Sequence, residues 1–98
     1  KDTLVIITGE FGRTPKINKN AGRDHWGALS TLAFAGGDYE QGRVIGRSDT
    51  KATAPNSLPI TPMDIRATVL DHMEIPSNLT YFDTFGRPQY MTTGKVIL

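Results

Sequence analysis

The chain of 98 residues contains no cysteine and no excess of charge of either sign. Without cysteine, a disulfide-bonded scaffold and a thiolate metal site are excluded, so a metal would need imidazole, carboxylate or other oxygen ligands. Eleven Lys and Arg residues against ten Asp and Glu give a net charge of +1, too balanced for a dedicated nucleic-acid-binding domain. The longest apolar run, residues 4–7, is far shorter than the roughly 20 residues that span a bilayer. We therefore expect no nucleic-acid partner and no membrane span.

Three apolar segments predict strands. Residues 3–8 are apolar on successive positions and rich in β-branched types, which is typical of a strand buried on both faces in a parallel sheet. Residues 29–35 favour a strand, with a helix as the alternative, and residues 44–45 predict a short strand between glycines. The polar segments between them are predicted to be exposed loops, at residues 16–27 and 48–59.

The strongest helix signal begins at Thr61. Thr61 is a preferred N-cap residue, Pro62 suits the first helical position, and the Asp64 carboxylate can reach back to the cap amide. Apolar residues at helical spacing continue to about Met73. The aromatic-rich tail, residues 80–98, predicts irregular strands or a hairpin.

Polar residues that could form a site follow the first predicted strand. Glu10 lies at the end of that strand, where ligands collect in parallel sheets, and Arg13 and His25 follow it. A carboxylate and an imidazole are compatible ligands for zinc, manganese or iron, and a guanidinium can hold an oxyanion with two hydrogen bonds. The alternative is that Glu10 pairs with Arg13 on a solvated loop while His25 only hydrogen-bonds to backbone.

The neighbours of His25 allow two further interpretations. Adjacent residues of an extended chain point to opposite sides, so Asp24 and His25 could both bind one metal only with special loop geometry. A simpler arrangement places His25 on the metal and Asp24 outside it. Trp26 could line a pocket beside this cluster or cover a hydrophobic core.

The order of these motifs resembles one family. The segments GEFGRTP at 9–15 and GRDHW at 22–26, then the capped helix start at 61–65 and GRP at 86–88, are similar to the C-terminal part of the sulfatase-like proteins called domain of unknown function 1501, in the alkaline phosphatase superfamily. The resemblance implies a doubly wound, mainly parallel α/β sheet. It also implies that residues 1–98 are a single C-terminal segment of a larger domain of that type.

The resemblance assigns roles residue by residue. Where the superfamily has an Asp-His-Gly turn that binds metal, this chain has Glu10, Phe11 and Gly12, and His25 matches a downstream His ligand. Glu10 can replace the Asp, whereas Phe11 cannot replace the His. Either Asp24 compensates, or fewer metals bind, or catalysis is altered or lost. A divalent metal is implied, zinc, manganese, calcium or magnesium.

Two functions of different classes follow from the resemblance. The first is part of a metal-dependent hydrolase of sulfate or phosphate esters, in which Arg13 and Arg23 bind the oxyanion and a nucleophile lies earlier in the chain. Its partners would be a small-molecule or glycan ester and the rest of its own chain, and the family implies export to the periplasm or the outside of the cell. The second is a non-catalytic binding or structural protein of the same fold. A third, simpler interpretation is that the polar loop only contacts a partner domain.

Overall fold

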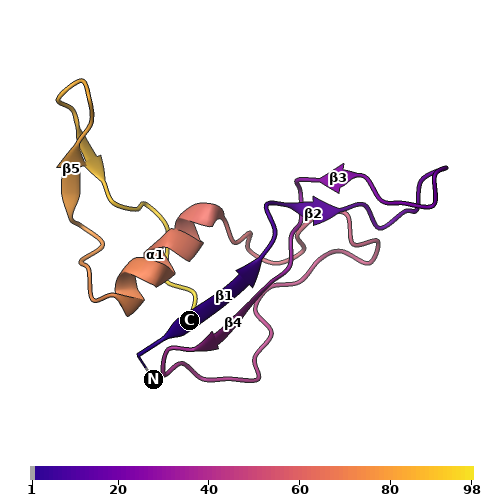
Figure 1. The fold of residues 1–98 in the computed structure, drawn as a ribbon, viewed down its shortest axis with the longest axis horizontal. Coiled ribbons are helices and arrows are strands. Elements are labelled where there is room, and N and C mark those ends of the chain that lie inside the picture. The colour runs from indigo at the N-terminus through magenta and orange to yellow at the C-terminus, as the bar shows by residue number, and fades with distance from the viewer. Residues whose placement is uncertain (1) are drawn as a thin grey trace. The chain divides into compact units, whose positions relative to one another are not determined.

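The computed structural model describes residues 2–98, and the chain divides into two compact units between Pro59 and Ile60. Figure 1 shows the elements in chain order. They are β1 (Leu4–Thr8), β2 (Gly12–Arg13), β3 (His25–Trp26), β4 (Leu32–Gly36), α1 (Pro62–His72), β5 (Thr80–Phe82) and β6 (Pro88–Tyr90). The strands pair as three separate two-stranded sheets, β1 with β4, β2 with β3 and β5 with β6.

The expected doubly wound, mainly parallel α/β sheet is wrong. All three strand pairs are antiparallel, and the described residues contain one helix of 11 residues. In β1, Leu4 and Ile6 are half-buried while Val5 and Ile7 are exposed by 47% and 67%. The alternation is that of an antiparallel strand with one covered face. An uninterrupted apolar run therefore did not mean burial on both faces.

Of the other predicted strands, one is confirmed and one is wrong. The segment 29–35 forms β4, so the strand interpretation is confirmed over the helix. The strand expected at 44–45 is wrong, because these residues have no regular structure and Val44 is 94% exposed. The polar loop expected at 16–27 ends in a short strand, β3, which pairs with β2 and was not predicted. Residues 48–59 are a loop, with one isolated bridge between Ser48 and Pro55.

Helix α1 begins as its sequence predicts. Pro62 is the first helical residue, and the N–H of Thr61 donates to Oδ2 of Asp64 at 2.8 Å. The same carboxylate accepts from the N–H of Lys95 through Oδ1, also at 2.8 Å. The N–H groups of Thr61 and then of Lys95 lower the pKa of Asp64 below its ordinary value, since both favour the charged form. One side chain thus caps the helix and fastens the C-terminal segment.

The C-terminal segment is bonded along α1 by threonine hydroxyls. Thr68 is fully buried in the helix, where its Oγ1 donates to the carbonyl of Asp64 at 2.8 Å and accepts from the N–H of Ile97 at 3.1 Å. Thr92 is also buried, and its Oγ1 donates to the carbonyl of Met63 at 2.9 Å. Around these bonds Ala67 and Leu70 form the small apolar core of residues 60–98. The tail was expected to form irregular strands or a hairpin, and residues 80–90 form the hairpin of β5 and β6.

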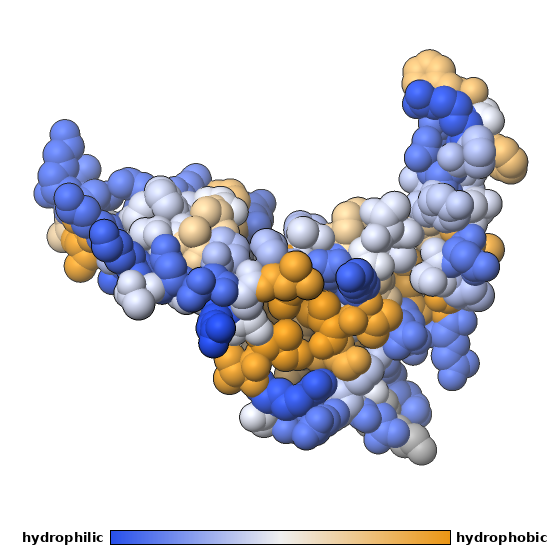
Figure 2. Space-filling model, turned by 180° about the vertical axis from the view of Figure 1, so that it is seen from behind, coloured by the Kyte–Doolittle hydropathy of each residue, from blue (hydrophilic) through white to orange (hydrophobic). Residues whose placement is uncertain are grey.

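Much apolar surface stays exposed. Figure 2 shows apolar residues (orange) at the surface of the face it presents. The exposed apolar side chains of the chain include Ile17 and Leu58 in residues 2–59, and Met73 and Phe85 in residues 60–98. No helix of residues 2–98 combines the length and the hydropathy needed to cross a membrane.

Candidate functional site

The segment that carries most predicted site residues folds into a hairpin, which we call the cationic hairpin (residues 12–26). Its stem is the pairing of β2 with β3, with Gly12 opposite Trp26 and Arg13 opposite His25. The N–H of Thr14 extends the ladder by donating to the carbonyl of Asp24 at 3.0 Å. The hairpin contains four cationic residues, which are Arg13, Lys16, Lys19 and Arg23. Asp24 is its single acidic residue. The hairpin therefore concentrates positive charge in a chain whose net charge is only +1.

An asparagine organises the tip of the cationic hairpin. Oδ1 of Asn18 accepts from the backbone N–H groups of Asn20 and Gly22, each at 3.0 Å. Its Nδ2 donates to the Asp24 carboxylate at 2.9 Å. Side-chain bonds of this kind replace the backbone pairs that a regular strand would make. The tip therefore has a defined shape, and the carboxylate of Asp24 is engaged within it.

Both arginines are held by backbone carbonyls and keep unused donors. Nη1 of Arg23 donates to the carbonyls of Thr14 and Pro15, at 2.8 and 2.6 Å. Nη1 of Arg13 donates to the carbonyl of Arg23 at 3.4 Å. Neither guanidinium forms an ion pair within residues 2–98, so the alternative pair of Glu10 with Arg13 does not form there. Because a guanidinium has five N–H donors, most of them stay available to a bound anion.

His25 and Asp24 have different surroundings. The His25 ring packs on Phe11, with ring centroids 4.4 Å apart and an angle of 52° between the planes. Asp24 instead lines a hollow together with Trp26. This division is what an extended backbone imposes on adjacent side chains. Which of the two residues would bind a metal stays a prediction.

The expected metal ligands do not form a metal centre by themselves. No group of three or more His, Cys, Asp or Glu side chains in residues 2–98 is arranged to hold a metal ion. Glu10 is exposed and is in neither of the ion pairs within that range. Carboxylate and imidazole donors suit zinc or manganese chemically, but a closed site needs about four ligands. Glu10, Asp24 and His25 therefore stay predicted ligands that this structure does not gather.

A hollow of about 530 Å³ lies beside the cationic hairpin. Its wall includes the Trp26 ring, so Trp26 lines a pocket, one of the two roles expected for it. The indole N–H donates to the carbonyl of Thr53 at 2.8 Å, which fixes the orientation of the ring. The full lining is Thr14, Pro15, Lys16, Ile17, Asn18, Lys19, Asp24, Trp26 and Thr53.

Sequence reasoning missed the contribution of the loop 48–59 to this hollow. The Asp49 carboxylate accepts from the N–H and the hydroxyl of Thr53, at 2.7 and 2.6 Å. These two bonds lower the pKa of Asp49 because they favour its charged form, and the hydroxyl of Thr53 has the larger effect. The signal available in the sequence was an Asp four residues before a Thr in a polar loop, which permits such a turn but does not show that Thr53 reaches Trp26.

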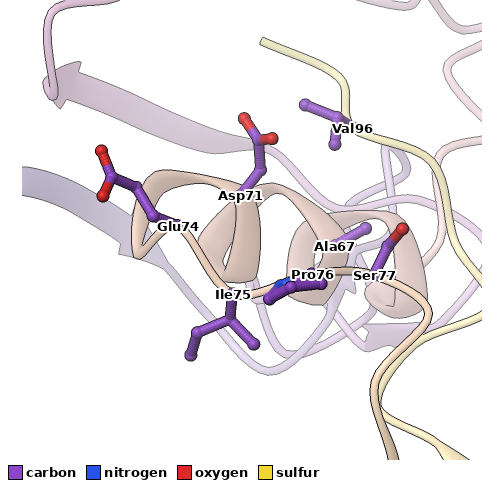
Figure 3. Close-up of a pocket in the computed structure, with 7 residues that line it drawn as sticks. All are labelled: Ala67, Asp71, Glu74, Ile75, Pro76, Ser77 and Val96. Carbon is purple, nitrogen blue, oxygen red and sulfur yellow. The ribbon is translucent and has the colours of Figure 1, made fainter.

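A second hollow of about 240 Å³ lies at the C-terminal end of α1, and Figure 3 shows the residues around it. The carboxylates of Asp71 and Glu74 are among them, with the apolar side chains of Ile75 and Val96. This hollow was not predicted, because residues 71–77 and Val96 are far apart in the chain. Its polar side chains include no cation, which makes it a poorer candidate than the hollow beside the cationic hairpin.

Comparisons with known proteins give one finding. No curated protein and no solved structure matches the chain. The family described as "Protein of unknown function (DUF1501)" matches residues 1–98. Because the match covers the whole chain, this chain belongs to the DUF1501 family.

Proposed function

We propose that the chain is part of a metal-dependent hydrolase of sulfate or phosphate esters, related to the alkaline phosphatase superfamily. The observation that carries the proposal is the cationic hairpin, on which Arg13 and Arg23 have unused N–H donors and no carboxylate partner within residues 2–98. Such a loop suits an anion with several equivalent oxygens. We further propose that the substrate is a small-molecule or glycan ester and that the protein is exported, periplasmic or extracellular.

The arginines would act on the charge of the ester. Hydrolysis of a sulfate or phosphate ester passes through a transition state whose negative charge is spread over non-bridging oxygens. A guanidinium already held in place stabilises that charge without reorganising. Arg23 is held by two carbonyls of the hairpin and supports the loop, whereas Arg13 makes one long bond and is freer to meet an oxyanion. No residue of 1–98 is proposed as the nucleophile.

Glu10 and His25 are the proposed metal ligands, with Asp24 outside the metal. The identity of the metal among zinc, manganese, calcium and magnesium is left to experiment. Because the described residues do not gather a metal-holding group, no step of the reaction is assigned to the metal. His25 is exposed on the same hairpin as the two arginines, so its imidazole is accessible for the proposed role as a ligand.

A second function is favoured by a specific contact. Phe11 stands where the superfamily has a metal-binding His, and its ring packs at 4.4 Å on His25. A phenylalanine ring in that place cannot bind a metal, and it covers part of His25, the other expected imidazole ligand. A non-catalytic protein that binds anionic esters would retain the cationic hairpin and tolerate this contact.

Hydrolysis of p-nitrophenyl sulfate and p-nitrophenyl phosphate separates the two functions. Measured with each of the four metals supplied in turn, the whole protein should turn over at least one ester. His25→Ala should lower kcat by at least about 100-fold, because even the loss of a residue that only supports a metal ligand costs about 10–100-fold in metal affinity or activity. His72→Ala is the matched control, because the second His of the chain lies in α1, and kcat should not change. Absence of turnover with every metal, or equal effects of the two variants, would contradict the hydrolase proposal.

A further inference from the structure

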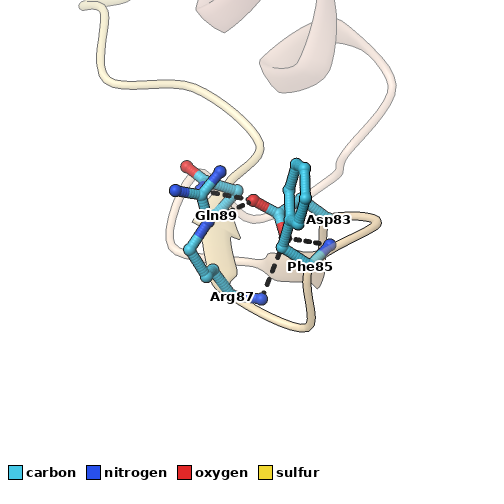
Figure 4. A network of polar contacts seen from close by, with 4 residues as sticks. All are labelled: Asp83, Phe85, Arg87 and Gln89. Atoms are coloured by element: carbon cyan, nitrogen blue, oxygen red, sulfur yellow. Dashed lines mark hydrogen bonds and ion pairs between the residues drawn. The ribbon is translucent and has the colours of Figure 1, made fainter.

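The β5–β6 hairpin ends in a turn that is fixed by one carboxylate (Figure 4). Asp83 accepts from the N–H groups of Phe85 and Arg87, each at 2.9 Å, and from Nε of Arg87 at 2.8 Å. Nε2 of Gln89 adds a fourth bond at 3.2 Å. The N–H of Arg87 is the main cause that lowers the pKa of Asp83. The turn therefore holds the two strands in one register.

The hydrogen bonds of the hairpin define which backbone groups face outward. One backbone hydrogen bond closes each end of the hairpin. The Met91 N–H donates to the Leu79 carbonyl at 2.9 Å, and the Asp83 N–H donates to the Arg87 carbonyl at 3.0 Å. In an antiparallel pair, bonded and non-bonded residue pairs alternate. Thr80 and Phe82 therefore belong to non-bonded pairs, and their N–H and C=O groups point away from β6. No hydrogen bond to these groups occurs within residues 2–98.

The two outer edges of the hairpin differ in what they can bind. On the β6 edge, Pro88 has no N–H to donate, and a proline at such a position discourages strand addition. The β5 edge consists of Thr80, Tyr81 and Phe82, without proline or charge. Only β5 therefore presents a continuous edge to another strand.

The hairpin is also poorly covered. Tyr81 and Phe82 are exposed by 45% and 73%, and Phe85 at the turn by 82%. In Figure 2 the hairpin rises at the right, with apolar residues exposed at its end. A two-stranded hairpin is at best marginally stable in water, and additional strands with buried aromatic side chains stabilise it. Both the edge and the faces of β5 thus favour an added strand.

We propose that β5 pairs with β5 of a second copy of this chain, antiparallel about a two-fold axis between the two Tyr81 residues. In this register Thr80 faces Phe82 of the second copy, and the outward N–H and C=O groups of both residues meet as bonded pairs. Tyr81 faces Tyr81 of the second copy as a non-bonded pair, in which side chains approach most closely. The result is a four-stranded antiparallel sheet in the order β6, β5, β5, β6.

The charges near the edge are compatible with a second copy. In the proposed register Asp83 comes opposite Leu79 of the second copy, so no two like charges face each other. The charge of Asp83 is already paired with Arg87 at 2.8 Å within its own hairpin. A self-complementary edge of this kind is what a two-fold interface requires. The inference does not depend on the proposed hydrolase activity.

Disulfide trapping tests the register. Because the chain has no cysteine, Tyr81→Cys introduces one thiol, and two such thiols would meet across the non-bonded pair at a distance that a disulfide spans. Mild oxidation should link Tyr81→Cys into dimers at least about tenfold faster than Tyr90→Cys, whose position lies on the far strand. Equal rates for the two variants would overturn the proposal.

Association in solution supplies the second readout. The mass of the wild-type protein, measured by light scattering up to about 0.5 mM, should rise from monomer toward dimer, since so short an interface is weak. Tyr81→Lys should abolish the rise by placing two ammonium groups opposite each other, and Tyr90→Lys should retain it. Circular dichroism verifies that both variants fold. A monomer mass at every concentration, or equal loss in both variants, would contradict the pairing.

Discussion

Gly94→Ala should lower the free energy of unfolding of residues 60–98 by about 3 kcal/mol or more, because there is no room for a side chain at this position. A Cβ atom at Gly94 would overlap the carbonyl group of Met63 and lie 2.5 Å from the N–H nitrogen of Asp64. Both belong to the first turn of α1, which cannot retreat without breaking the bonds of Asp64 to Thr61 and Lys95. The expected result is loss of helix and of the docked C-terminal segment together.

Urea unfolding followed by far-ultraviolet circular dichroism measures this effect. Thr93→Ala is the matched control, since Thr93 is adjacent, exposed and makes no side-chain hydrogen bond within residues 2–98. Its free energy of unfolding should change by less than about 0.5 kcal/mol. If both variants unfold at the same urea concentration as the wild type, the close packing of the C-terminal segment on α1 is not a feature of the protein in solution.

Gly12→Ala should disrupt the cationic hairpin, with a loss of about 3 kcal/mol in the stability of residues 2–59. A Cβ at Gly12 would overlap the Leu29 carbonyl oxygen and approach its carbon to 2.9 Å. It would also come within 3.2 Å of the Trp26 carbonyl, on the strand that pairs with Gly12. Gly12 of the GEFGRTP motif is thus required because the backbone at Leu29 and at Trp26 lies too close for a side chain.

Tryptophan fluorescence follows this second effect, because Trp26 is the single tryptophan of the chain and lies on β3. Gly12→Ala should shift its emission to longer wavelength and lower the midpoint of unfolding. Gly9→Ala is the control within the same motif, where the nearest atom to a Cβ is the Phe11 carbonyl oxygen at an ordinary 3.7 Å. An emission spectrum unchanged by Gly12→Ala would rule out the close backbone approach.

The sequence was sufficient for elements that are specified locally. The capping residues Thr61 and Asp64 and the proline at 62 act within one helical turn, so they predicted the start of α1 correctly. A hairpin was one of the two structures expected for the tail, because GRP between aromatic residues is a local turn signal. In both cases the interactions that decide the structure lie within about ten residues of one another.

Pairing between distant segments could not be predicted in the same way. The apolar run of β1 is compatible with a parallel or an antiparallel partner, and only the pairing of Ile6 with Phe34 decides between them. The doubly wound sheet was expected from the family resemblance, and this expectation was wrong for these residues. The short pair of β2 with β3 was missed because two-residue strands have no periodicity to detect.

The candidate site was predicted in part. Arg13, Arg23 and His25 were proposed from the sequence as site residues, and the structure places all three on the cationic hairpin. Their roles stay predictions. The packing of Phe11 on His25 and the bond from Trp26 to Thr53 were not predicted, because they depend on how the loops fold. A metal centre made of Glu10, Asp24 and His25 stays a prediction.

The central claim is that the cationic hairpin binds an oxyanion through Arg13, and calorimetric titration with inorganic sulfate and inorganic phosphate tests it most directly. Arg13→Gln should raise the Kd for at least one of the two anions about tenfold or more, since a hydrogen bond to a charged group contributes about 1.5–3 kcal/mol. Arg43→Gln removes the same charge from a guanidinium that is paired with Glu40 outside the hairpin, and its Kd should equal that of the wild type. Equal Kd values for Arg13→Gln and Arg43→Gln, or no binding of either anion by the wild-type protein, would contradict the claim.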